Sequence, residues 1–401
     1  MQNSCKLTRT NYKGLSKSNE LKKIVYNISF LFCCTSVIMS PQFGKPKPKP
    51  VIIAYVGGFR GLIGTDSIDV WRLSHINYAF VDVKDNRAWL HFEKTDTINL
   101  RKLSELKNVN PNLKILISLG GWTWSKNFSD AVLTDTSRQN FATSAVAIVA
   151  KYNLDGIDID WEYPGMMGDS NVYRPEDKQN YTLLFRDLRH GLDSLSQITH
   201  SKYFVTTAVG GWKAYIDHTE MGKLQQYTDY INIMSYDFTD GSDTISGHHT
   251  NLYNSSTDTS QSSAHRAVQE FMAAGVPASK LVMGIAFYGK GWQMQSGDNN
   301  GLYRKSLRGM RGGGFTYLKD SVIDKNGYKQ YWDPVAMAPY LFNSETNIFI
   351  SYDDEKSVEE KCKYVKKNHL AGAMFWEYAS DKKEYLLKVI ADNFKYRKKN
   401  K

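Results

Sequence analysis

From residue 51 onward, the chain alternates short apolar runs with longer stretches of helical periodicity. A short apolar run is typical of a buried strand, whereas apolar residues recurring three and four positions apart are typical of a helix. Such runs predict eight strands, at 51–56, 75–81, 113–119, within the acidic stretch 154–164, and at 203–209, 230–234, 281–287 and 372–376. Between them, helices are predicted at 138–151, 176–194, 262–274 and 358–368.

This alternation predicts the fold class. Eight strand–helix units favour an α/β fold of the parallel (β/α)8 TIM barrel type. An open doubly wound sheet is the alternative, but such sheets usually have fewer strands, and no glycine-rich phosphate loop follows the first strand here.

The spacing between the seventh and eighth strands exceeds what one helix needs. The excess, at about residues 290–350, is rich in Gly, Tyr and Asn and predicts an inserted α+β lobe. Because an insertion after the C-terminal end of a strand lies on the catalytic face of such a barrel, we expect the lobe to form one wall of a groove.

The acidic stretch 154–164 combines a strand pattern with three acids on one face. Asp158, Asp160 and Glu162 share one parity, and the apolar residues between them face the other way. Neighbouring carboxylates repel one another, so they require shared protons, partners or a substrate. The alternative is a solvated edge strand with a metal-like acidic stripe. The apolar residues between the acids require burial, however, and no His or Cys accompanies them, so we expect neither a metal nor a cofactor.

The spacing Asp155-x-x-Asp158-x-Asp160-x-Glu162 resembles the DxxDxDxE motif of family 18 glycoside hydrolases, the chitinase family. Further segments resemble family motifs in the right order at the ends of predicted strands: SxGG at 118–121, MxYD at 234–237, FYG at 287–289, and the closing segments 351–354 and 372–377. The resemblance covers nearly all of 51–394 and implies a catalytic barrel that hydrolyses chitin. As a short single-domain chain, it also resembles chitinases secreted by apicomplexan parasites.

The resemblance implies a role for each catalytic residue. Glu162 would be the general acid and then the base, and the substrate's own N-acetyl carbonyl would be the nucleophile. Asp160 would orient the acetamido group, Asp158 would share a proton with Asp160, and Tyr236 would donate to the acetamido oxygen. Crowding by the two neighbouring acids is expected to keep Glu162 protonated at mildly acidic to neutral pH.

Binding positions follow from the same motifs. The reacting sugar is expected to stack on Trp376, and Asp237 is expected to help hold it in a distorted shape. Lys290 stands where some relatives carry Arg, and it lacks the bidentate geometry of Arg. The other positions that line the groove in the family correspond here to Tyr55, Phe80, Gly121, Trp122, Met234 and Tyr288.

The expected activity is endo-acting hydrolysis of β-1,4-linked N-acetylglucosamine polymers by a retaining mechanism. One alternative is an endo-β-N-acetylglucosaminidase acting on N-glycans, which shares the acidic motif. The other is a chitin-binding lectin-like protein, which shares the fold but lacks the acid that Glu162 supplies here. The inserted lobe and the aromatic residues favour a linear chitin chain over a branched glycan.

Composition and charge narrow the expected partners. Apolar residues make up 41% of the chain and aromatic residues 13%, which is ample for a large core. The net charge of +10 lies in the tails, since residues 1–50 carry +8 and 395–401 carry +5, which leaves −3 for 51–394. The folded part therefore offers no basic field for nucleic acid. Chitin or chito-oligosaccharides are the expected partners of a monomer.

The N-terminus has the features of a targeting segment. Six Lys or Arg precede residue 24, and the apolar run 24–39 suits the core of a signal peptide. We therefore expect a signal segment at 1–40, a Lys/Pro linker at 41–50, the catalytic domain at 51–394, a basic tail at 395–401, and secretion without stable membrane insertion. An uncleaved anchor is the alternative. Three of the four cysteines precede residue 40, so cleavage leaves Cys362 without an internal disulfide partner.

Overall fold

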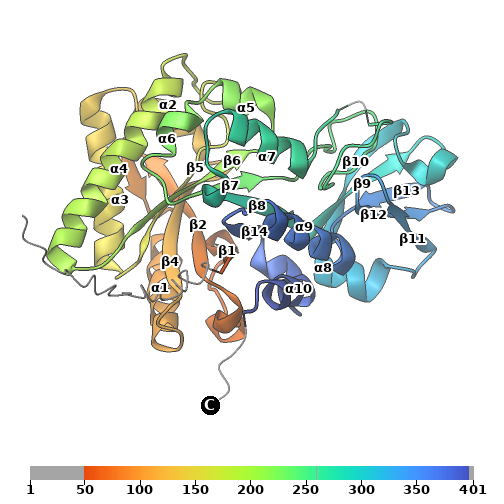
Figure 1. Cartoon of the computed structure of the whole chain (residues 1–401), viewed down its shortest axis with the longest axis horizontal. Coiled ribbons are helices and arrows are strands. Elements are labelled where there is room, and N and C mark those ends of the chain that lie inside the picture. Colours follow the sequence, from red (N-terminus) through yellow and green to blue (C-terminus); the bar gives the residue numbers. More distant parts are fainter. Residues whose placement is uncertain (1–48, 259, 397–401) are drawn as a thin grey trace, which may run out of the picture. The chain divides into compact units, whose positions relative to one another are not determined.

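The computed structural model describes residues 49–258 and 260–396; the predicted signal segment, most of the linker and residues 397–401 lie outside the described residues. In the described part, eight parallel strands close into a barrel because the first strand pairs with both the second and the last (Figure 1). In chain order they are β1 (Val51–Gly57), β2 (His75–Lys84), β4 (Lys114–Gly120), β5 (Gly156–Asp160), β6 (Phe204–Gly210), β7 (Tyr230–Met234), β8 (Leu281–Ala286) and β14 (Gly372–Trp376).

Helices follow the barrel strands, which confirms the predicted (β/α)8 barrel. Two of them begin with a capping box: Thr134 and Ser137 at the start of α3, and Asp354 and Ser357 at the start of α9. The longer helices are α1 (Glu93–Glu105), α3 (Asp135–Lys151), α4 (Asp177–Thr199), α7 (Ala264–Ala273), α9 (Glu355–Lys367) and α10 (Tyr385–Asn393). Shorter elements are β3 (Arg87–Trp89), α2 (Phe128–Ala131), α5 (Lys213–Asp217), α6 (Met221–Leu224) and α8 (Phe315–Tyr317).

Side chains of the barrel strands form two layers, because alternate residues point into the barrel or toward the helices. The interior layer includes Ile53, Tyr55 and Met374. The outer layer includes Ile157 and Ile159 of β5, which pack with the helices as the alternation predicts. The acidic residues of β5 therefore point into the barrel.

A second sheet lies between β8 and β14 in the sequence. Its five antiparallel strands have the order β10-β9-β13-β12-β11, and they enclose a small core that includes Trp292, Tyr340 and Phe349. This sheet confirms the predicted lobe. Its strands are β9 (Tyr288–Met294), β10 (Ser306–Gly314), β11 (Tyr328–Asp333), β12 (Ala338–Asn343) and β13 (Ile348–Ser351).

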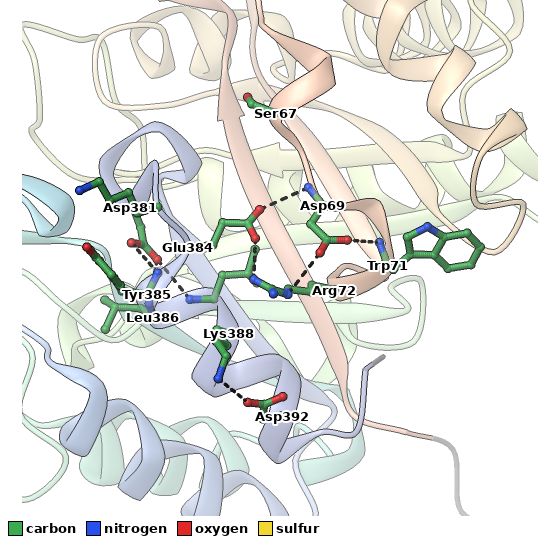
Figure 2. A network of polar contacts seen from close by, with 12 residues as sticks. Ser67, Asp69, Trp71, Arg72, Asp381, Glu384, Tyr385, Leu386, Lys388 and Asp392 are labelled. Carbon is green, nitrogen blue, oxygen red and sulfur yellow. Dashed lines mark hydrogen bonds and ion pairs between the residues drawn. The ribbon is translucent and has the colours of Figure 1, made fainter. Parts of the chain in front are cut away.

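Polar contacts join the segment after β1 to the last helix (Figure 2). Arg72 donates to Glu384 at 2.6 Å, and the backbone N–H of Asp69 lies 3.3 Å from the same carboxylate. Asp381 accepts from the N–H groups of Tyr385 and Leu386 at the start of α10. The contacts of Glu384 with Arg72 and Asp69 connect the first and last β/α units. In the described ranges, 49–258 and 260–396, no helix combines the length and apolar character needed to cross a membrane.

Candidate active site

The deepest acid of the motif, Asp158, is held by hydroxyl groups from neighbouring strands. In the parallel ladder it lies level with Ser118 of β4 and Thr206 of β6. Their hydroxyls donate to its carboxylate at 2.7 and 2.5 Å, and the Tyr55 phenol donates at 3.0 Å. Burial nevertheless raises the pKa of Asp158. Since these contacts fix the carboxylate, its position is set by the barrel itself.

Asp160 lies one step closer to the cavity and has fewer partners. It is only 4% exposed, and within the described residues its Oδ1 has no hydrogen-bond partner. Burial, followed by the charges of Glu162 and Asp158, raises the pKa of Asp160 well above its ordinary value. In the described part of the chain, the contacts of Asp158 go to other strands, so a proton shared with Asp160 stays a prediction.

Glu162 lies two residues beyond the end of β5, where backbone contacts fix its position. Its N–H donates to the Ser125 hydroxyl at 3.1 Å, and that hydroxyl donates to the Asp160 carbonyl at 2.9 Å. Gly120, at φ +113°, permits the approach, because a Cβ there would lie 2.2 Å from the same carbonyl oxygen.

Burial raises the pKa of Glu162 to about 8, and the charge of Asp237 adds to this effect. The sequence predicts that Asp158 and Asp160 keep Glu162 protonated; burial is the largest influence on its pKa, and the repulsion between Glu162 and Asp160 raises the pKa of Asp160 as well. Because β5 ends at Asp160, Glu162 lies at the rim of the cavity, which Asp237 also lines.

A cavity of about 470 Å³ opens above these acids. Every predicted site residue except Asp158 lines it: Tyr55, Phe80, Gly121, Trp122, Asp160, Glu162, Met234, Tyr236, Asp237, Tyr288 and Trp376. The structure therefore brings together residues from five of the motifs that the sequence separates.

Aromatic rings form one side of the cavity. The Trp376 ring is stacked with Phe80 and Phe59, with ring centroids 5.4 and 6.2 Å apart. The Tyr55 phenol is occupied by its bond to Asp158, so it holds the acid. By contrast, among the described residues the Tyr236 hydroxyl has only a 3.9 Å contact with the Met374 sulfur, which leaves it available to a ligand.

Several residues of the site were not predicted. Phe59 and Trp124 line the cavity from loops, where strand periodicity gives no information. Ser118, Thr206 and Asn232 surround Asp158 from neighbouring strands. These three had a usable signal, since a polar residue at an inward position of a barrel strand needs a partner.

Asp237 is held from the lobe side of the cavity. It has a left-handed φ of +60°, which is uncommon for a residue with a side chain. Tyr288 donates to its Oδ1 at 2.6 Å, the Lys290 Nζ lies 2.9 Å away, and the His249 Nδ1 lies 3.4 Å away. Burial opposes ionisation here, but His249, Lys290 and Tyr288 together lower the pKa of Asp237 to about 2.

Further cavities continue from the first. The second, of about 450 Å³, shares Tyr288 and Trp376 with it and reaches Arg311 of the lobe. A third shares Arg60 and Glu377 with the second. Among the described residues, no group of His, Cys, Asp and Glu has an arrangement suited to a metal ion.

The family model "Glycosyl hydrolases family 18" matches residues 51–381. Chitinase A1 of Niallia circulans is 39% identical over 379 residues, covering 80% of this chain but only 54% of that protein, so the chain spans about half of that relative. A solved family 18 N-acetylglucosaminidase from Paenibacillus barengoltzii is 42% identical with a TM-score of 0.81, covering 86% of this chain and 99% of that one. A solved chitinase from Bacillus thuringiensis is 32% identical with a TM-score of 0.81, covering 88% and 71%.

Proposed function

This chain belongs to family 18 of the glycoside hydrolases, and from that premise we propose that it hydrolyses chitin and chito-oligosaccharides with retention of the anomeric configuration. One observation carries the proposal: the pKa of Glu162 is raised to about 8 at the rim of an aromatic-lined cavity. A carboxyl group that stays protonated at neutral pH can act as the general acid that glycoside cleavage needs.

The proposed reaction has two steps. In the first, Glu162 donates its proton to the glycosidic oxygen while the carbonyl oxygen of the substrate's N-acetyl group attacks the anomeric carbon. The bond to the leaving sugar breaks, and a cyclic oxazolinium ion forms. In the second, the Glu162 carboxylate takes a proton from a water molecule that attacks the same carbon from the opposite side. The acetamido carbonyl is displaced, and the two displacements together restore the β configuration.

Asp160 and Tyr236 are proposed to hold the acetamido group. The unpartnered Oδ1 of Asp160 would accept its N–H, and the Tyr236 hydroxyl would donate to its oxygen. Asp158 would act from deeper in the barrel than Asp160, where the hydroxyls of Ser118 and Thr206 hold its carboxylate. The Trp376 ring would carry the apolar face of the sugar.

The connected cavities favour cleavage within a chain over removal of single terminal sugars. The second and third cavities continue the first past Trp376 and along Arg60 and Glu377, so they offer room for further sugar units. A specific observation favours a second candidate, an enzyme that removes single N-acetylglucosamine units, because a protein described as an N-acetylglucosaminidase is 42% identical. Cleavage of N-glycans is the third candidate, and only the acidic motif supports it.

One experiment separates the candidates. A chitin hexamer labelled at its reducing end is incubated with the enzyme, and the first products are separated by size. An endo-acting chitinase yields short labelled oligomers from the start, whereas an enzyme that removes single sugars from the non-reducing end yields the labelled pentamer and unlabelled monosaccharide. A high-mannose glycoprotein is incubated in parallel, and an N-glycan enzyme would release glycan from it. Glu162→Gln is the matched control for any contaminating activity. Absence of hexamer cleavage by the wild-type chain would reject the proposed substrate.

A further inference from the structure

A buried segment, residues 246–250, connects the lobe with the catalytic cavity. The Ser246 hydroxyl donates to the Gly301 carbonyl in the lobe. At the other end, the Thr250 hydroxyl donates to Asp353 at 2.8 Å, just before α9. All five residues of the segment are buried. His249 therefore lies in a segment that is fixed on both sides.

His249 occupies an unusual position in this segment. Its N–H donates to the Ser351 hydroxyl at 3.0 Å, and its carbonyl accepts from the N–H of Phe238, the residue after Asp237. Its imidazole is fully buried against the Tyr288 ring, with centroids 5.3 Å apart. Within the described residues, neither ring nitrogen has a partner at full hydrogen-bond geometry. Buried polar atoms are normally satisfied, so this imidazole calls for a functional explanation.

Contacts to Asp237 suggest what that function is. The hydroxyl of Tyr288, the Nζ of Lys290 and the Nδ1 of His249 all approach the same oxygen, Oδ1. These contacts leave Oδ2 as the oxygen that can accept from a ligand in the cavity that Asp237 lines. A carboxylate held on one oxygen by three groups has little freedom to rotate.

We propose that His249 is a positioning residue for the hydrolytic reaction: it holds Asp237 by Oδ1, presents Oδ2 to the substrate and, with Lys290, limits the electric field of Asp237 at Glu162. This inference rests on the proposed function and concerns the same site. His249 itself touches no reacting atom.

The charged groups around His249 determine its ionisation. Lys290 faces it from β9, Asp353 from the start of α9, and Asp237 from the end of β7. Burial is the largest influence and lowers the pKa of His249, so the imidazole is neutral at neutral pH. The adjacent carboxylate assigns the proton to Nδ1, and His249 acts through that N–H.

Two substitutions of similar size test the role of this N–H. In His249→Asn, an amide N–H replaces Nδ1 at nearly the same place, whereas in His249→Gln the amide reaches the position of Nε2. His249→Gln is expected to lower kcat by about tenfold, since a small misplacement near the reacting atoms is costly. It should also move the basic limb of the kcat/KM profile up by about half a pH unit, because the less compensated charge of Asp237 favours protonated Glu162. His249→Asn should recover most of both properties.

Controls separate this effect from loss of structure. His190→Gln makes the same chemical change at an exposed position of α4 and should leave both quantities unchanged. Thermal unfolding reports whether the buried substitutions fold. Lys290→Met avoids the buried segment, and it should also move the basic limb upward because it removes a positive charge 2.9 Å from Asp237.

Definite results would overturn the inference. If His249→Gln keeps the wild-type kcat and pH profile, His249 does not position Asp237. If kcat falls while the basic limb stays in place in both His249→Gln and Lys290→Met, these residues only support the fold. Both results presuppose an active wild-type chain; an inactive wild type would instead reject the proposed function.

Discussion

At the scale of single residues, proton transfer depends on Glu162. Glu162→Gln keeps the shape and the hydrogen-bonding capacity of the side chain but removes the proton that is donated. We expect kcat on a chitin hexamer to fall by about 10²–10⁴-fold, the usual contribution of a general acid–base group. Binding of the hexamer, measured by calorimetry, should remain because the aromatic surface is intact. Turnover close to that of the wild type would remove Glu162 from the mechanism.

The raised pKa of Glu162 predicts how the activity depends on pH. The free enzyme is competent when this carboxyl group is protonated, so kcat/KM should fall as the pH rises through about 8. An unshifted glutamate would lose its proton below pH 5 and leave little activity at neutral pH. A pH series of kcat/KM on a soluble oligomer measures the limb, and a basic limb below pH 6 would contradict the burial argument.

The two aspartates of β5 should respond differently to the same substitution. Asp160→Asn alters the group that faces the cavity, whereas Asp158→Asn alters a carboxylate already held by Ser118, Thr206 and Tyr55. We therefore expect kcat to fall further for Asp160→Asn, by about tenfold more, because the carboxylate charge that faces a positively charged intermediate is lost. If Asp158→Asn is the more damaging change, the acetamido contact has been assigned to the wrong residue.

For single residues, the sequence predicts some contacts of the site but not others. The parity of Asp158, Asp160 and Glu162 predicted which acids meet, because side chains in a strand alternate strictly. It could not predict that Asp237, which follows β7, also acts on Glu162, or that burial is the largest influence on the pKa of Glu162. Which charges lie near Glu162 depends on the residue at which β5 ends, and the alternation of side chains does not determine that residue.

At the scale of elements, a buried ion pair fixes α9 to the segment 246–250. The Lys361 Nζ lies 2.6 Å from Asp353 Oδ2 and 2.7 Å from the Thr250 hydroxyl, and the side chains of Lys361 and Asp353 are fully buried. Removing one partner leaves the other charge buried and uncompensated. We expect Lys361→Met to lower the free energy of unfolding by about 3–5 kcal/mol.

Lys363 offers the matched control for this prediction. It lies two residues further along α9, where its contacts with Glu359 and Glu360 are exposed to solvent. Lys363→Met should leave the denaturation midpoint unchanged. Equal midpoints for the two variants in urea would show that the buried pair does not hold α9 in place.

Strands and loops differ in how well their positions can be predicted from the sequence. Seven barrel strands begin within one residue of the predicted position, because short apolar runs bounded by polar residues are strong signals. Loops carry no such period. Phe59 and Trp124 reach the cavity from loops after β1 and β4, and His249 lies twelve residues beyond Asp237 in a segment without periodicity. Their positions follow from tertiary packing, so the pattern could not reveal them.

At the scale of the whole chain, the order of the motifs was the most informative feature. Apart from the segment 351–354, which follows lobe strand β13, each motif reaches the C-terminal end of a barrel strand, and a closed parallel barrel brings these ends to one face. The sequence therefore predicted the composition of the cavity well. It could not predict the two further cavities, because residues far apart in the sequence line them, from β10 of the lobe and from the segment after β14.

The central claim is that the substrate supplies the nucleophile, and the anomeric configuration of the first product tests it most directly. Proton NMR during fresh hydrolysis of a chitin hexamer reports the anomer before mutarotation, with cellohexaose and fully deacetylated chitosan as matched substrates that lack the N-acetyl group. We predict that the β-anomer appears first and that neither matched substrate is cleaved at a comparable rate. An initial α-anomer, or comparable cleavage of cellohexaose, would contradict substrate assistance and the roles given to Asp160 and Tyr236.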